Sequence, residues 1–193
     1  MPSYSFAGVQ SIASSSASQP VFGTSTTAAA SPTYDQFAGN RTGANPSVTT
    51  LAVSSTEGFT DGSNILVATT AQLGSANPNV GRVVGIVSTT SMTVSGLNQS
   101  VASGAWVILA EEAESITIKP IVGNSAVIYI GTAQTVSSTD ASVIDVLPNP
   151  TSSTYSFNFF HAETTDKGHA YNTSQYWASG TASDKFVANF TQG

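Results

Sequence analysis

The sequence predicts an all-β protein in which an extended N-terminal arm precedes two small antiparallel β-sandwich or barrel modules. Short β-branched runs alternate with turn residues from about residue 46 onward, which is typical of sandwiches and barrels. No segment keeps the 3.6-residue apolar period of a helix. The 193 residues, 40% of them hydrophobic and 9% aromatic, are enough to form one or two small cores.

Residues 1–45 form the predicted arm. They are dominated by Ser, Ala, Thr, Gly and Gln, and their apolar residues show no sustained period. Because these apolar residues are too widely spaced for a core of their own, we expect them to anchor the arm in grooves of partner chains. The anchors we single out are Phe6, Phe22, Tyr34 and Phe37. A disordered leader is the alternative that the composition leaves open.

The first module is predicted over residues 46–111. Glu57-Gly58, Asp61-Gly62 and Ser103-Gly104 supply the backbone conformations that reverse a chain between strands. The expected strands are 48–53, 64–68, 82–87, 91–94 and 105–109.

The second module is predicted over residues 112–193, with the boundary in the acidic cluster of Glu111, Glu112 and Glu114. Ile116 and Ile118 alternate with polar residues, so this strand should have one buried and one solvated face. The expected strands are 115–119, 126–130, 142–147, 155–160, 175–178 and 185–190.

The number and spacing of charged residues indicate which kinds of partner the chain could bind. Only 8% of the residues are charged, the formal net charge is −6, and the five basic residues are scattered singly. Nucleic-acid binding is not expected, because affinity for phosphates requires several clustered Lys or Arg side chains. No apolar run is long enough for a membrane span, and the first residues lack the features of a secretory signal. A surface of Ser, Thr and Asn avoids the cost of burying charges and therefore suits packing against neighbours.

Enzymatic and metal-binding motifs are weak. The chain has no Cys. His161 and His169 flank two acidic residues, but their spacing matches no zinc motif, and Gly168 indicates a loop. Asp140 and Asp145 could suggest a glycosidase pair, yet their separation within one strand would put them on opposite faces. We expect no enzyme activity, no catalytic residues, no cofactor and no metal.

Four aromatic residues could form a sugar-stacking platform. They are Trp106, Tyr171, Tyr176 and Trp177. Both Trp residues lie in strand contexts, where aromatic residues more often belong to a core or a subunit interface, and this second interpretation is the one we favour.

Two stretches resemble modules of tailed-phage virion proteins. Residues 49–59 read TTLAVSSTEGF and resemble a small β-module of virion and fibre proteins. Residues 116–120 (ITIKP), 127–131 (VIYIG) and 176–190 (YWASGTASDKFVANF) resemble a β-sandwich of head-surface and decoration proteins. The resemblance implies a structural virion protein, and above all a capsid decoration, or cement, protein that stabilises the head surface.

The expected partners are the major capsid protein and copies of the chain itself, in a homo-oligomer for which a trimer is one candidate. The expected location is the head surface of the virion, after assembly in the host cytoplasm. Two other functions stay open. One is a tail, baseplate or fibre component of the same virion, and the other is a carbohydrate-binding adhesin domain.

Overall fold

The structure is a computed structural model that describes residues 5–32, 48–69, 71–73, 77–149, 160–163 and 171–191. In these ranges every regular element is a β-strand except one short 3-10 helix, Thr173–Gln175. The predicted all-β class is therefore confirmed. The chain divides into two compact units. Unit 1 comprises Met1–Phe22 and Glu112–Gly193, and unit 2 comprises Gly23–Glu111.

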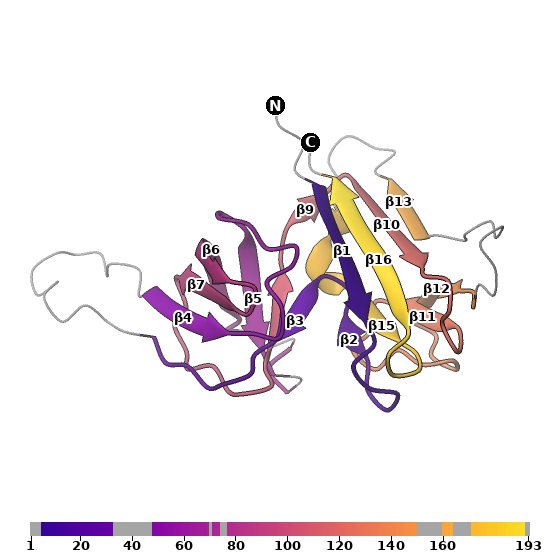
Figure 1. The fold of residues 1–193 in the computed structure, drawn as a ribbon, viewed down its shortest axis with the longest axis horizontal. Helices are drawn as coiled ribbons and strands as arrows, with labels where there is room; N and C mark the ends of the chain where they lie inside the picture. Colours follow the sequence, from indigo (N-terminus) through magenta and orange to yellow (C-terminus); the bar gives the residue numbers. More distant parts are fainter. Residues whose placement is uncertain are drawn as a thin grey trace, which may run out of the picture. The chain divides into compact units, whose positions relative to one another are not determined.

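The first sheet of unit 1 joins the two ends of the chain. Its antiparallel strands follow the order β1 (Ser5–Ser11), β16 (Lys185–Thr191), β10 (Ser115–Pro120) and β13 (Phe160–Glu163) (Figure 1). Alternate side chains of β16 and β10 are buried, as the sequence pattern predicts for strands with one solvated face. The buried residues are Phe186, Ala188, Phe190, Ile116 and Ile118.

The second sheet of unit 1 contributes the other buried face of the sandwich. Its order is β12 (Val143–Leu147), β11 (Ile128–Gly131), β15 (Trp177–Ser179) and β2 (Gln19–Pro20). A separate two-stranded ribbon pairs β14 (Tyr171–Asn172) with β9 (Glu112–Ala113). The residues that this sheet buries completely are Ile128, Ile130, Leu147 and Ala178.

A polar clamp holds the turn before β16 to the turn before β11. The buried Asp184 carboxylate accepts hydrogen bonds from the backbone N–H groups of Ser125 (2.6 Å) and Ala126 (3.0 Å). Asn124 Oδ1 accepts from the Lys185 N–H at 2.7 Å, and Asn124 Nδ2 donates to the Lys185 carbonyl at 2.9 Å. Ser183 adopts a left-handed conformation with φ 74° just before Asp184. These bonds satisfy backbone groups that would otherwise be buried without partners.

Unit 2 is a single curled sheet. Its order is β3 (Gly23–Ser25), β8 (Trp106–Leu109), β5 (Asn64–Ala68), β6 (Asn79–Ser88), β7 (Ser91–Ser95) and β4 (Val48–Ala52) (Figure 1). An antiparallel bridge between Thr26 and Val53 joins the ends of the two outer strands. Large apolar residues that the curled sheet buries are Leu51, Ile65, Val67, Val83, Met92, Val94, Val107 and Leu109.

The start of β6 depends on two residues that the sequence analysis did not single out. A Cβ atom on Gly81 would lie 2.8 Å from the Ser95 carbonyl oxygen, so only glycine fits this approach of β6 to β7. The buried Asn79 accepts hydrogen bonds from the N–H groups of Asn98 (3.0 Å) and Gln99 (3.3 Å) through Oδ1. It thereby fixes the turn that follows β7.

All the expected strands that fall within the described residues are present, with ends shifted by up to three residues. The largest change in length is in β6, which extends the expected strand 82–87 at both ends. The expected strand 155–160 lies outside the described residues except for its last residue, which begins β13. The second chain crossing between units falls between Glu111 and Glu112, at the boundary expected from the acidic cluster.

The predicted arm is wrong where the structure describes it. Residues 5–32 supply β1 and β2 of unit 1 and β3 of unit 2, and Ile12, Val21 and Phe22 are buried. Widely spaced apolar residues do not form a core among themselves, but each enters a core built by residues distant in sequence. In the sequence, unit 2 therefore interrupts unit 1, whose two segments lie before and after it. The remainder of the expected arm, 1–4 and 33–45, lies outside the described residues.

Replacing Phe22 by Ala should therefore destabilise unit 1. Phe22 is fully buried, and its ring meets Phe190 edge to face with centroids 5.6 Å apart. We expect Phe22→Ala to lower the free energy of unfolding by about 3 to 5 kcal/mol in chemical denaturation. Val87→Ala, at an exposed position, serves as the control and should change it by less than about 0.5 kcal/mol. Equal effects of the two substitutions would contradict the burial of Phe22.

Candidate interaction surfaces

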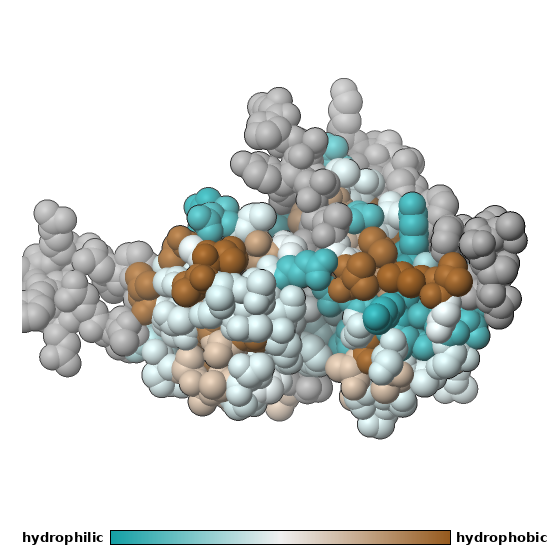
Figure 2. Space-filling model, in the orientation of Figure 1, coloured by the Kyte–Doolittle hydropathy of each residue, from teal (hydrophilic) through white to brown (hydrophobic). Residues whose placement is uncertain are grey.

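Strand β6 presents a row of exposed aliphatic side chains on unit 2, which we call the β6 face. Its members are Val80, Val84, Ile86 and Val87. Val87 is 64% exposed and Val80 is 51% exposed, although both lie in a strand at the centre of its sheet. Figure 2 shows apolar side chains gathered over this part of unit 2. Contiguous exposed apolar groups on a sheet mark contact surfaces more often than isolated ones do.

Most of this exposure follows the alternation of the strand, and one of two β-bulges adds to it. The register between β6 and β7 shifts between Val83 and Gly85 and again between Ile86 and Ser88, so it skips Val84 and Val87. Val80, Val84 and Ile86 face out by the period of two, whereas Val87 would face inward and is turned out at its bulge. The signal is visible in the sequence, because Val80, Val84 and Ile86 put apolar residues at alternate, outward positions of the strand.

A third bulge lies in unit 1. The register between β11 and β12 shifts between Ile130 and Gly131 and skips Ile144, which is exposed together with Val146. Strand β12 is an edge strand, and bulges on edges hinder unwanted pairing with another strand. Asp145 supports this arrangement, because its Oδ1 accepts the N–H of Val146 at 2.8 Å.

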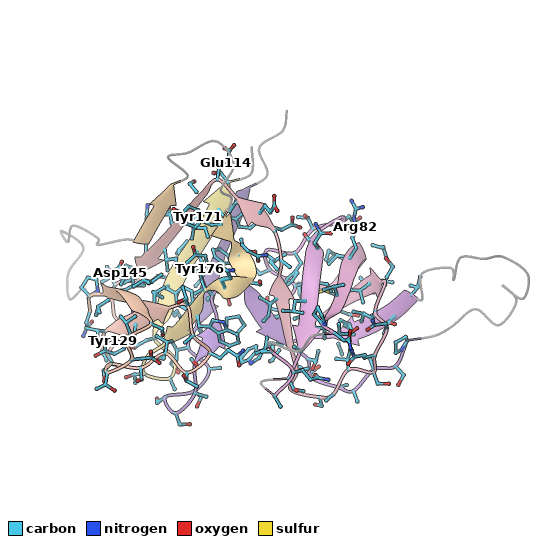
Figure 3. All side chains as sticks on the ribbon, turned by 180° about the vertical axis from the view of Figure 1, so that it is seen from behind. Arg82, Glu114, Tyr129, Asp145, Tyr171 and Tyr176 are labelled. Atoms are coloured by element: carbon cyan, nitrogen blue, oxygen red, sulfur yellow. The ribbon has the colours of Figure 1, made fainter. Side chains whose placement is uncertain are left out.

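The β6 face carries one charge. Arg82 is the only charged residue in the sequence between Gly62 and Ala110. Its Nε donates a hydrogen bond to the Gly62 carbonyl at 3.0 Å, and the side chain points out from unit 2 (Figure 3). A partner that covers the β6 face would therefore desolvate aliphatic groups at the cost of at most one cation.

The outward face of the β1, β16 and β10 strands is a second candidate surface, here called the β16 face. Val9 of β1 is 47% exposed and lies opposite Val187 of β16, and Val187 lies opposite Lys119 of β10. Figure 2 shows an apolar row across these strands with hydrophilic side chains beside it. This face differs from the β6 face in having two exposed lysines, Lys119 and Lys185.

The four predicted arm anchors do not form one site. Phe22 is buried in unit 1, so it cannot insert into a partner, and this part of the prediction is wrong. Phe6 lies in β1, opposite Phe190 in the register. Tyr34 and Phe37 lie outside the described residues.

The four aromatic residues do not form a sugar-stacking platform. Tyr176 and Trp177 are buried, while Trp106 and Tyr171 are half-buried. Trp106 belongs to unit 2 and the other three belong to unit 1. Tyr171 and Tyr176 are close enough to interact electrostatically, and burial, followed by the charge on Tyr171, raises the pKa of Tyr176 to about 12 (Figure 3).

The acidic and histidine side chains were examined in the sequence as possible metal ligands or catalytic groups. Among the described residues, no group of three His, Asp or Glu side chains could hold a metal ion. His161, expected in a loop, lies in strand β13 opposite Thr117, and His169 falls outside the described part of the chain. Asp140 precedes β12 rather than lying within it, and hydrogen bonds from the Ser142 backbone and hydroxyl lower the pKa of its carboxyl group.

Comparison with known proteins adds no relative. No protein-family model, no curated protein and no solved structure matches the chain. Within the described residues, no helix is both long and apolar enough to cross a membrane.

Tyr176 should titrate late if it is buried as described. Its folded pKa of about 12 exceeds the ordinary value of 10.0, so the folded state holds the proton more tightly than the unfolded state. The resulting stabilisation is complete below pH 10 and is lost as the pH rises toward 12. Ultraviolet absorbance of tyrosinate should show one late tyrosine that is missing in Tyr176→Phe. Titration of every tyrosine near pH 10 would contradict this.

Proposed function

We propose that this chain is a structural virion protein of a tailed phage, and specifically a capsid decoration protein that binds and stabilises the head surface. The observation that carries the proposal is the β6 face, where four aliphatic side chains are exposed in a stretch of sequence whose only charged residue is Arg82. Exposing such an apolar face to water costs free energy, and covering it with a partner is favourable. The sequence resemblance to head-surface sandwiches supports the choice of particle.

The proposed mechanism is mechanical and uses no catalysis or bound cofactor. Each copy would cover part of the surface of the major capsid protein with its β6 face. Burial of aliphatic groups contributes about 25 cal/mol per Å² of apolar area, so a single contact of this size is modest. Many copies acting on one particle would sum to substantial resistance against internal pressure. The location would be the outside of the head, after assembly in the host cytoplasm.

A tail, baseplate or fibre component would need the same kind of binding surface as a head decoration protein. Locating the chain on intact particles separates these two hypotheses. Antibodies against the chain should label the heads of intact particles in electron microscopy. Label confined to tails or fibres would replace the head assignment by the alternative, and particles without any label would contradict both. The adhesin alternative loses its proposed site, because Tyr176 and Trp177 are buried.

Val84→Asp should reduce the number of copies bound per head by about tenfold or more, since a buried carboxylate without a partner costs several kcal/mol. The matched control is Val122→Asp, because Val122 is similarly exposed (42%, against 47% for Val84) but lies in unit 1. Copies per head can be measured by gel densitometry of particles purified after incubation with each variant. Equal occupancy for both variants would show that the β6 face is not the binding surface.

A further inference from the structure

Strand β12 is an open edge of unit 1. It pairs with β11 on one side and ends the order of its sheet, so among the described residues no strand pairs with its other side. An edge of this kind presents backbone N–H and C=O groups to a strand of another chain. The composition of β12 suits such pairing, because four of its five residues are Val, Ile or Leu.

Asp145 is the only charged residue of β12. It is the middle residue of the strand, and it is also the only charged residue in the sequence between Asp140 and His161. Without it β12 would be an uninterrupted run of aliphatic residues, which is the composition that promotes pairing between strands of different chains. A single carboxylate therefore decides whether this edge is apolar along its whole length.

The Asp145 side chain lies on the inward side of the sheet. Asp145 is opposite Ile130 in the register with β11, and directly opposite residues of paired strands share a face. Ile130 is fully buried, whereas Asp145, at the edge of the sheet, is half-buried (Figure 3). A strand added beside β12 would cover the carboxylate and remove it from water, which is why an inward-pointing charge protects an edge strand.

Asp145 also engages a backbone donor of the edge strand. Its Oδ1 accepts the N–H of the next residue, Val146, at 2.8 Å. A backbone N–H that is bonded to a side chain of its own strand is not offered to a strand of another chain. The charge and this hydrogen bond thus act in the same direction.

We propose that Asp145 prevents β12 from pairing with β12 of a second copy of this chain. Two copies of one edge pair along their whole length when they run antiparallel about a twofold axis. Because Asp145 is the middle residue of β12, this arrangement sets the Asp145 carboxylates of the two copies directly opposite each other. Like charges in that position destabilise a strand pair, and both would also lose water. The inference does not depend on the proposed function.

Asp145→Val should allow the two edges to pair. Sedimentation velocity of the purified full-length chain, from about 10 to 500 µM, should show association strengthened by about tenfold or more relative to the natural chain. Each copy has one β12 edge, so the new contact should double the mass and then stop. The melting temperature should not fall, because a β-forming aliphatic side chain replaces a half-buried charge. Asp145→Thr should also associate, and it provides the test if Asp145→Val does not fold.

Two matched variants separate the effect of this charge from other effects. Asp145→Lys keeps a charge at the middle of the edge and should associate no more than the natural chain. Asp61→Val removes one negative charge from an exposed turn of unit 2 and adds the same side chain, so it too should leave association unchanged. Hydrogen exchange locates the contact, because the Val146 amide of Asp145→Val should become more protected as the protein concentration rises.

Three results would overturn the inference. Association of Asp145→Val and Asp145→Thr no stronger than that of the natural chain would show that this carboxylate does not keep the edge open. An equal gain in Asp145→Lys or Asp61→Val would show that a charge at this position is not what matters. Stronger association without added protection of the Val146 amide would place the contact on another surface.

Discussion

The pairing of β1 with β16 is the constraint on which the rest of the structure depends. Seven residues near the start of the chain pair in register with seven near its end, and Phe22 meets Phe190 across a similarly long stretch of sequence. Closing so long a loop costs conformational entropy, and only contacts that form after closure can offset this cost. Unit 2 forms within that loop from a continuous stretch of chain, Gly23–Glu111, so it can gain its contacts without waiting for the ends to meet. We therefore expect unit 1 to be the slower part to fold, as long-range β pairing generally is.

The surface follows from how the strands treat their outer faces. Where alternation is strict, as in β16, one face of the strand is buried and the other is solvated. Where a bulge breaks the alternation, as at Val87, an aliphatic side chain that would face inward is turned out to solvent. Assembly through several modest contacts is the behaviour that such a surface favours.

The sequence predicted the fold class and the strands whose residues alternate or are β-branched, which are β4 to β8, β10 to β12, β15 and β16. The short ribbon of β9 and β14 was not predicted. The sequence also did not predict β1, β2 and β3, because SFAGVQS and its neighbours have small or polar residues at most positions, and their pairing rests on backbone hydrogen bonds to strands far along the chain. For the same reason Phe22 was expected in a partner rather than in the core. The β6 face was missed although apolar residues at alternate, outward positions of β6 signal it.

Native-state hydrogen exchange of the β1 amides tests most directly whether the start of the chain belongs to the fold. Amides of Ser5–Ser11 that are bonded to β16 should be protected to about the same degree as those between β10 and β16, because both sets open only when the sheet opens. Exchange of the β1 amides at the rate of an unstructured peptide, alongside a protected β10–β16 pair, would contradict the account and restore a free N-terminal arm.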